Sequence, residues 1–263
     1  MSAFYVRGIG MQAPGMQGWS ACCGVLSGRV PYSDQALVPP MPEILPSNER
    51  RRATASVRLA LSAAQEAAAA SGVDVSAFAT VFTSSDGDGV TLDQICNTLA
   101  RAPLDLSPTR FHNSVHNAPA GYWSIAIQSR HASTSLCAFD ASFAAGLMEA
   151  AAQVAAGPAP VLLVAFDLPF PPVLNPLRPV SVPVAVALAL SADPGSAPMA
   201  RCALAFEASA APAFAGQGGL DALYANPAGR ALPLLALLAQ RAPGTVRLEY
   251  LDSCSLAVQA QPF

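Results

Sequence analysis

Residues 107–157, SPTRFHNSVHNAPAGYWSIAIQSRHASTSLCAFDASFAAGLMEAAAQVAAG, decide the fold of this chain. The run Ser133–Phe139 predicts a strand, and the apolar stretch from about Ala141 predicts a buried helix that Gly157 closes in a left-handed conformation. A strand that turns sharply into a buried helix can expose a nucleophile at the helix N-terminus, where the dipole and free N–H groups favour negative charge. The junction at residues 139–142 reads Phe-Asp-Ala-Ser and carries no cysteine.

The neighbouring segments alternate between strands and helices. Buried strands are expected at Phe78–Thr83 and at Val161–Asp167, where the run VLLVAFD is continuously apolar. Helices are expected at Thr91–Arg101 and Ala118–Arg130. This alternation favours an α/β fold with a mostly parallel mixed sheet and helices on its faces.

The two ends of the chain are expected to add further elements. FYVRGIGMQAPG predicts an opening strand, and the proline-rich stretch Val30–Pro46 predicts an ordered loop. Ser47 is expected to cap one long helix that ends at Gly72. VPVAVALALS and ARCALAFEAS predict two more strands, and Leu232–Gln240 predicts a short helix before two closing strands.

Composition narrows the classes of partner. Only 12% of the 263 residues are charged, against about 25% in an ordinary chain, so part of the surface is expected to be buried against another subunit. An alanine-rich composition is the alternative explanation. The net charge of −3 excludes nucleic acid as a partner.

Targeting signals and paired cysteines are not evident. The apolar runs fall short of the ~20 residues that a membrane span needs, and MSAFYVRGIG has no basic region before a long apolar stretch. The six cysteines show no paired spacing, which argues against a disulfide framework. We therefore expect a cytoplasmic protein without a membrane span.

The order of these segments resembles the N-terminal half of the β-ketoacyl synthases of the thiolase-like superfamily. The resemblance spans roughly residues 3–192, which implies a thiolase-like N-terminal half followed by a shortened C-terminal part, residues 193–263, in one domain. It is most similar to the ketosynthase-like chain-length factors of type II polyketide synthases, such as those that make aryl polyenes. The matching pieces are Gly8–Ile9–Gly10, Pro14–Gly15, Trp19, Leu26–Ser27–Gly28, the helix after Ser47, VFTSSDGDG, SPTRFHNSVHNAPAGYWSIA, SFAAGLMEA, VLLVAFD and VPVAVALALS.

The resemblance also has implications for catalytic residues. In the catalytic members a cysteine opens the buried helix, and two histidines from the C-terminal half assist condensation. Matching SFAAGLMEA to that helix puts the cysteine slot at or next to Asp140, which is itself expected to be an N-cap rather than a base. Cys137 is the nearest thiol and is expected inside the strand, so it is only a weak candidate nucleophile. We therefore expect a subunit without condensing activity of its own.

No cofactor or metal is expected. His112 and His116 are four residues apart, but they lack a third ligand, and we expect them to serve packing or hydrogen bonding instead. SSDGDG lacks the terminal glutamate of a calcium loop and the third glycine of a dinucleotide fingerprint, so we interpret it as a turn.

The implied partners are a full-length ketosynthase, in a heterodimer, and an acyl carrier protein. Residues expected at the acyl tunnel or the subunit interface are Phe111, His112, His116, Asn117 and Trp123. The triplet Arg50, Arg51 and Arg52 lies near the start of the expected helix and forms either a solvated helix face or a docking site for the acidic carrier protein. Two other functions remain open: acyl transfer through Cys137, and a scaffold that only stabilises a ketosynthase.

Overall fold

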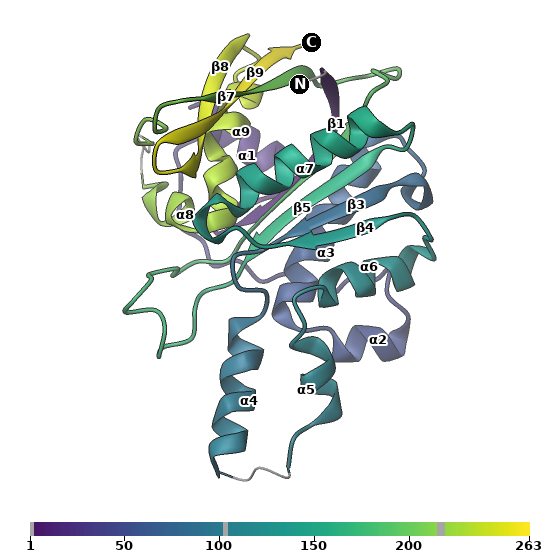
Figure 1. Ribbon diagram of the computed structural model, residues 1–263, viewed down its shortest axis with the longest axis vertical. Helices are drawn as coiled ribbons and strands as arrows, with labels where there is room; N and C mark the ends of the chain where they lie inside the picture. Colours follow the sequence, from purple (N-terminus) through teal and green to yellow (C-terminus); the bar gives the residue numbers. More distant parts are fainter. Residues whose placement is uncertain (1–2, 102–104, 215–218) are drawn as a thin grey trace.

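The computed structural model describes residues 3–101, 105–214 and 219–263, and one nine-stranded mixed sheet forms its centre (Figure 1). The strand order is β4-β3-β5-β6-β1-β7-β9-β8, and the short β2 pairs with β1. The strands are β1 (Phe4–Ala13), β2 (Met16–Gln17), β3 (Ala79–Thr83), β4 (Ser133–Leu136), β5 (Val161–Asp167), β6 (Val184–Ser191), β7 (Ala200–Glu207), β8 (Gly244–Leu251) and β9 (Cys254–Pro262).

The directions of the strands differ from the prediction. The mixed α/β architecture is confirmed, but the expectation of mostly parallel pairing is wrong. Only β3–β4 and β3–β5 are parallel among the described strand pairs, and the others are antiparallel. A parallel return to the sheet usually needs a helical crossover. The proline-rich segment between β5 and β6 contains no helix, so β6 runs back antiparallel beside β5.

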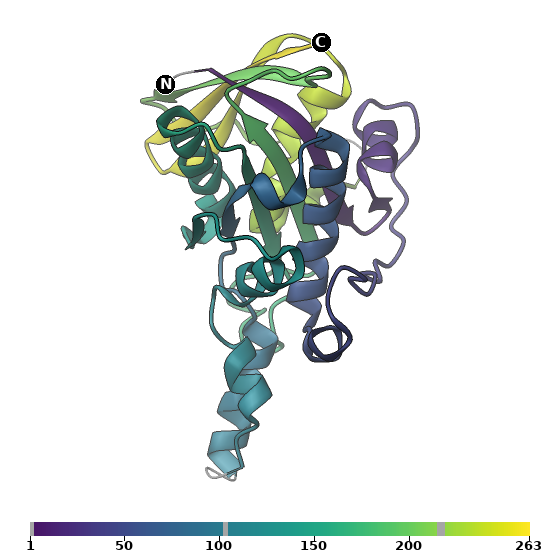
Figure 2. The same ribbon diagram turned by 90° about the vertical axis from the view of Figure 1, so that its right-hand side faces the viewer.

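Helices cover both faces of the sheet (Figures 1 and 2). Helices α3 and α6 lie on one face, and α7 and α9 lie on the other. The helices are α1 (Trp19–Leu26), α2 (Ser47–Arg52), α3 (Ala55–Ser71), α4 (Gly89–Arg101), α5 (Pro108–Asn113), α6 (Ala118–Ile127), α7 (Ser142–Ala156), α8 (Asp221–Ala225) and α9 (Leu232–Ala239), with 3₁₀ turns η1 (Val75–Ala77), η2 (Phe139–Ala141) and η3 (Pro227–Ala231).

Strand β5 separates two hydrophobic cores. Its side chains alternate between the faces of the sheet, as strand geometry requires. The α7 side contains Val161, Leu163 and Ala165, and the α3 side contains Leu162, Val164 and Phe166. The continuously apolar sequence is thus explained, because both faces of this central strand are covered.

Glycines in β1 let helix α3 lie very close to the sheet. A Cβ on Gly8 would lie 2.1 Å from the Ala67 carbonyl oxygen, and a Cβ on Gly10 would lie 2.0 Å from that of Ala63. The facing side chains on α3 are alanines, which need little room. Backbone-to-backbone packing therefore seats α3 on the sheet.

The expected long helix after Ser47 is two helices, so that prediction is wrong. Ala53 is extended (φ −61, ψ 122), and Thr54 begins the second helix by accepting a hydrogen bond from Val57 N–H at 3.5 Å. The predicted end at Gly72 is confirmed, with φ 66. Because of the break, the arginine triplet lies in the last turn of α2, where positive charge is favourable, and not near a helix start.

The ends of three other elements also differ from the prediction. Strand β4 ends at Leu136, so Cys137 lies outside it. Helix α6 ends at Ile127 because Gln128 is left-handed (φ 52). Gly157 follows α7 in an extended conformation (φ −150, ψ 170), and its expected left-handed cap is therefore wrong.

The C-terminal part continues the same sheet. Strand β7 pairs with β1, and the β8–β9 hairpin pairs with β7 through β9. Helix α9 and turn η3 pack into the core on the α7 side. Residues 193–263 thus contribute to the hydrophobic core that residues 1–192 begin.

Helices α4 and α5 project away from the sheet (Figure 2). They carry exposed apolar side chains, among them Leu92, Leu99 and Phe111. In the described ranges, no helix is long and apolar enough to cross a membrane.

Candidate functional site

The candidate site is the sharp junction between β4 and α7. Phe139 begins the turn η2 with φ 52, a left-handed conformation that a bulky residue adopts only under strain of about 1–3 kcal/mol. Ser142 holds this turn, because its Oγ donates to Phe139 O at 2.7 Å and accepts from Ala138 N–H at 3.1 Å. Thr83 Oγ1 on β3 donates to Ser142 O at 2.9 Å. The junction is therefore a strained elbow that the surrounding structure fixes.

Phe139, not Asp140, is the strained residue of the elbow. Phe139 is 61% exposed, so the elbow presents an aromatic residue at the surface. Asp140 does not cap α7: the N-cap residue is Ala141, and the Asp140 carboxylate forms an ion pair with Arg178. The predicted N-cap role of Asp140 is therefore wrong. Asp140 pairs with an arginine of the loop between β5 and β6 instead of accepting a hydrogen bond from the first turn of α7.

Arg178 joins the elbow to the loop between β5 and β6. Its guanidinium carbon lies 3.8 Å from the centre of the Phe139 ring and 5.0 Å from that of Phe170, both within the range of cation–π attraction. Its Nη1 also donates to Ser85 Oγ at 3.3 Å. Sequence reasoning missed Arg178, because it lies in a proline-rich loop without a recognisable motif.

A buried carboxyl group lies beneath the elbow, at the end of β5. Asp167 Oδ1 accepts hydrogen bonds from Ser84 Oγ at 2.9 Å, Ser85 N–H at 2.8 Å and Ser85 Oγ at 2.7 Å. Its Oδ2 has no partner in the described part of the chain. Burial raises the pKa of Asp167 to about 7, although the three hydrogen bonds lower it.

A second carboxyl group is perturbed next to the first. Burial raises the pKa of Asp86 to about 6, Arg178 and His116 lower it, and Asp88 raises it. Asp88 itself accepts from Ser56 Oγ at 2.8 Å and from Thr91 N–H at 2.9 Å, which caps α4. The segment SSDGDG is thus a turn, as predicted. Its Ser85 contacts the elbow region, because it accepts hydrogen bonds from Cys137 and Arg178.

Cys137 lies two residues before Phe139 and is exposed, contrary to its expected place inside the strand. Its Sγ donates to Ser85 O at 3.1 Å. The prediction failed because β4 stops pairing with β3 at Leu136. The thiol is accessible, but it belongs to the loop that precedes the elbow rather than to the first turn of α7.

The histidines serve as packing and hydrogen-bonding groups. His116 Nε2 lies 3.0 Å from Ser84 O, and the His112 ring packs edge-on against Tyr122 with ring centres 6.2 Å apart. Across residues 3–101, 105–214 and 219–263, no group of three or more histidine, cysteine, aspartate and glutamate residues could hold a metal ion.

The predicted tunnel and interface residues lie in three different environments. Phe111 is 62% exposed on α5. His116 and Asn117 line a hollow of about 530 Å³ between α6 and β4. The Trp123 side chain is fully buried in the α3-side core, behind this surface.

A second hollow, of about 710 Å³, opens beside the elbow. Phe139 and Asp140 form one wall, and Tyr250 and Leu251 from the β8–β9 hairpin form another. Leu251 is 62% exposed. Residues more than 100 positions apart meet here, so no local sequence signal could have placed them together.

The arginine triplet is divided between structural and exposed roles. Arg50 Nη2 donates to Glu43 O and Leu45 O, both at 2.9 Å, which holds the preceding loop. Arg51 bonds Asn48, and Arg52 lies 3.6 Å from Glu49. Arg51 and Arg52 are exposed.

Comparison with known proteins agrees with this architecture. No curated protein sequence matches the chain. Among solved structures, similar chains occur in a ketosynthase in complex with its chain length factor from Xenorhabdus doucetiae (24% identity, TM-score 0.74, covering 98% of this chain and 100% of that chain). Others are the ishigamide ketosynthase/chain length factor (13%, 0.77, 100% of both chains) and a β-ketoacyl synthase from Burkholderia phymatum STM815 (13%, 0.64, 91% and 71%).

The TM-scores show that the chain shares the fold of these ketosynthases. The family model for the N-terminal domain of β-ketoacyl synthases matches residues 27–236, which is most of the chain. This protein therefore belongs to the β-ketoacyl synthase N-terminal domain family.

Proposed function

We propose that this protein is a non-catalytic, chain-length-factor-like subunit that pairs with an active β-ketoacyl synthase in type II polyketide or aryl polyene biosynthesis. The observation that carries the proposal is Phe139 at the elbow. An elbow of this shape can present a nucleophile at a helix N-terminus, and a phenyl ring cannot attack a thioester. The solved ketosynthase/chain length factor complexes with the same fold support this choice.

The pairing surface would include the free edge of the sheet. Strand β4 is the last strand on its side, so its outer hydrogen-bonding groups are available to another chain. Exposed apolar side chains lie on the segments next to it: Ile125 on α6 is 50% exposed, and Phe139, which follows β4, is 61% exposed. Covering these groups would also account for the low proportion of charged residues in the chain.

A mixed-dimer experiment tests this surface. Gly121 lines the hollow beside β4, and a Cβ there meets nothing within 4 Å, so Gly121→Arg should fold and yet block a partner. Gly157→Arg is the matched control, because a Cβ at Gly157 also meets nothing within 4 Å, but this glycine lies after α7. On co-expression with a full-length ketosynthase, light scattering should show a mixed dimer for the wild type and for Gly157→Arg. Gly121→Arg should lose it, and recovery of only self-associated wild type would count against the proposal.

The subunit would act on chain length by occupying volume. A bulky side chain at the end of an acyl tunnel rejects each extra methylene by about 1–3 kcal/mol. Phe111 is our candidate for this role, so Phe111→Ala in the mixed complex should lengthen the products. Mass spectrometry of the released chains measures the effect. A plain scaffold would change the yield and leave the lengths unaltered.

The catalytic state is tested separately. The isolated protein, incubated with a labelled acyl carrier protein, should form no covalent thioester, since Phe139 provides no nucleophile. Cys137→Ala is the informative variant, because Cys137 is the accessible thiol nearest the elbow. A label on the wild type that disappears in Cys137→Ala would establish an acyl-transferring enzyme instead.

Carrier-protein docking is proposed for the exposed arginines of α2. Arg51 and Arg52 are exposed and contact side chains of their own helix, Asn48 and Glu49, which they can exchange for carboxylates or phosphate on an acidic partner. Arg50 is engaged by loop carbonyl groups. Arg51→Glu should therefore weaken carrier binding more than Arg50→Glu, after correction for any loss of stability.

A further inference from the structure

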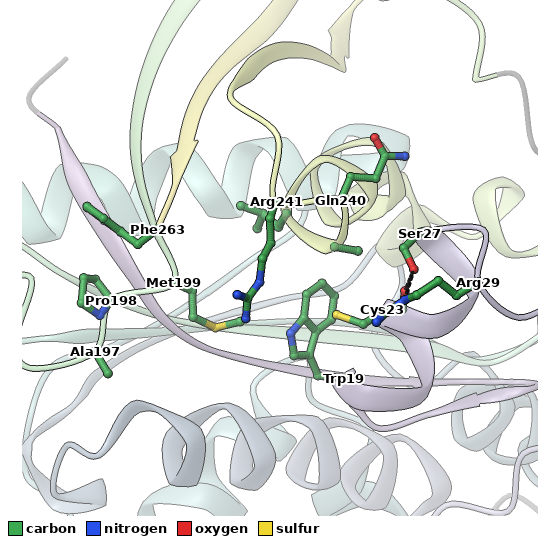
Figure 3. Close-up of a pocket in the computed structure, with 12 residues that line it drawn as sticks. Trp19, Cys23, Ser27, Arg29, Ala197, Pro198, Met199, Gln240, Arg241 and Phe263 are labelled. Atoms are coloured by element: carbon green, nitrogen blue, oxygen red, sulfur yellow. Dashed lines mark hydrogen bonds between the residues drawn. The ribbon is translucent and has the colours of Figure 1, made fainter.

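A third hollow lies between α1, α9 and the segment that precedes β7 (Figure 3). Its volume is about 780 Å³, within the range of about 300–1,000 Å³ that is usual for small-molecule sites. It shares no lining residue with the elbow or with the hollow beside β4. The residues that matter below are Trp19, Cys23, Arg29, Met199, Leu238 and Arg241.

Two guanidinium groups, those of Arg29 and Arg241, line this hollow. Arg29 Nε donates to Ser27 Oγ at 2.8 Å, which fixes the side chain. Within the described residues, neither Arg29 nor Arg241 has an acidic partner within 4.0 Å. Burial raises the pKa of the Cys23 thiol, and both arginines lower it, so their charges act on one point.

The backbone at Arg241 supports a specific placement of its side chain. Arg241 follows α9 in a left-handed conformation (φ 51), a position that glycine or asparagine usually occupies. Figure 3 shows its side chain reaching between Met199 and Trp19. Arg241 is exposed, and its side chain lies against apolar residues of the hollow, so its charge is presented next to an apolar surface.

The other lining residues offer an apolar surface next to this charge. Trp19 is half-buried, and its ring lies beside Cys23 in Figure 3. Met199 contributes a thioether, and Leu238 an aliphatic wall that is 6% exposed. Charge and apolar area thus adjoin within one hollow.

We propose that this hollow binds a small amphiphile whose anionic head, a carboxylate or a phosphate, lies between Arg29 and Arg241, while its apolar body packs on Trp19, Met199 and Leu238. Guanidinium groups bind both kinds of head through charge-assisted hydrogen bonds. The site is independent of the proposed role at the elbow, since it involves other residues and requires no partner subunit.

The test uses the purified full chain and three probes. Decanoate has head and body, decanol has the body alone, and inorganic phosphate has a head alone. Calorimetry should show decanoate binding at least tenfold tighter than either of the others. Decanoate should also change the fluorescence of Trp19, and Trp19→Phe should remove most of that change, because the chain's other tryptophan, Trp123, is fully buried elsewhere.

Matched variants assign the head group. The double variant Arg29→Gln/Arg241→Gln should bind decanoate at least tenfold more weakly, since each guanidinium contributes a charge-assisted hydrogen bond. The control, Arg110→Gln/Arg130→Gln, removes the same charge outside the hollow and should bind like the wild type.

Four results would overturn the inference, and the first three concern relative affinities. Equal affinity for decanol and decanoate would mean that the hollow is a purely apolar surface. Equal affinity for phosphate and decanoate would mean that it is a simple anion site. Unchanged decanoate binding in the Arg29→Gln/Arg241→Gln variant would mean that the two arginines do not bind the head group. Absence of any decanoate binding would overturn it as well. None of these outcomes bears on the mixed dimer or on the thioester assay.

Discussion

Asp167→Asn should stabilise the protein at alkaline pH and destabilise it in acid. Burial raises the pKa of Asp167 from 3.8 to about 7, so the folded state disfavours the ionised carboxylate. The folded pKa lies above the unfolded one. The neutral form's contribution to stability is therefore fully present below about pH 4 and is lost as the pH rises through about 7. Asparagine keeps an oxygen for the bonds from Ser84 and Ser85 but carries no charge.

The magnitude follows from the shift. A rise from 3.8 to about 7 corresponds to at most about 4 kcal/mol, at 1.36 kcal/mol per unit. The new amide N–H₂ replaces Oδ2, which has no partner within the described residues, and an unsatisfied donor costs about 1–3 kcal/mol. We expect a net gain of about 1–3 kcal/mol at pH 8. Between pH 5 and pH 8 the difference between variant and wild type should change by about 3 kcal/mol.

Urea unfolding at several pH values between 5 and 8 measures this difference. Asp252→Asn is the control, since Asp252 is exposed. The effect of Asp167→Asn should depend on pH more steeply than the effect of this control. The reasoning is refuted if Asp167→Asn and Asp252→Asn show the same pH dependence, or if Asp167→Asn is less stable than the wild type at pH 8.

The elbow and the close packing of α3 on β1 give two further predictions. Phe139→Gly should be more stable than Phe139→Ala by about 1 kcal/mol in urea unfolding. Both variants lose the contact with Arg178, but only alanine is strained by the left-handed conformation at this position. Equal stabilities of the two variants would mean that the backbone of the elbow relaxes. Gly10→Ala should cost about 3 kcal/mol or more, because its Cβ would lie 2.0 Å from Ala63 O, whereas Gly121→Ala meets open space and should gain up to about 1 kcal/mol. Similar thermal midpoints for these two variants would contradict the close packing of α3.

The local sequence pattern predicted most of the elements. The continuous apolar run Val161–Asp167 marks a strand covered on both faces, and Gly72 marks a helix end, since burial and left-handed geometry leave local signals. The segment SFAAGLMEA indicated a buried helix after a sharp turn without a cysteine, and the order of segments indicated the ketosynthase fold. These properties depend on the residue and its immediate neighbours.

Local patterns carried less information about strand direction and helix continuity. Apolar periodicity reports which side chains are buried but not which way a strand runs, so the antiparallel return of β6 was missed. The break at Ala53 was also missed, because alanine and threonine are compatible with a continuous helix until Thr54 caps the second one.

The sequence by itself determined that residues 139–142 contain no cysteine, and with it the expectation of a subunit without condensing activity. Only the tertiary structure decided which residue takes the strained position and what surrounds it. Phe139 is left-handed because Ser142 binds the turn on both sides, and Arg178 reaches the ring from a loop 39 positions further along the chain. Such contacts arise when distant segments meet in the folded core, so no short stretch of sequence specifies them.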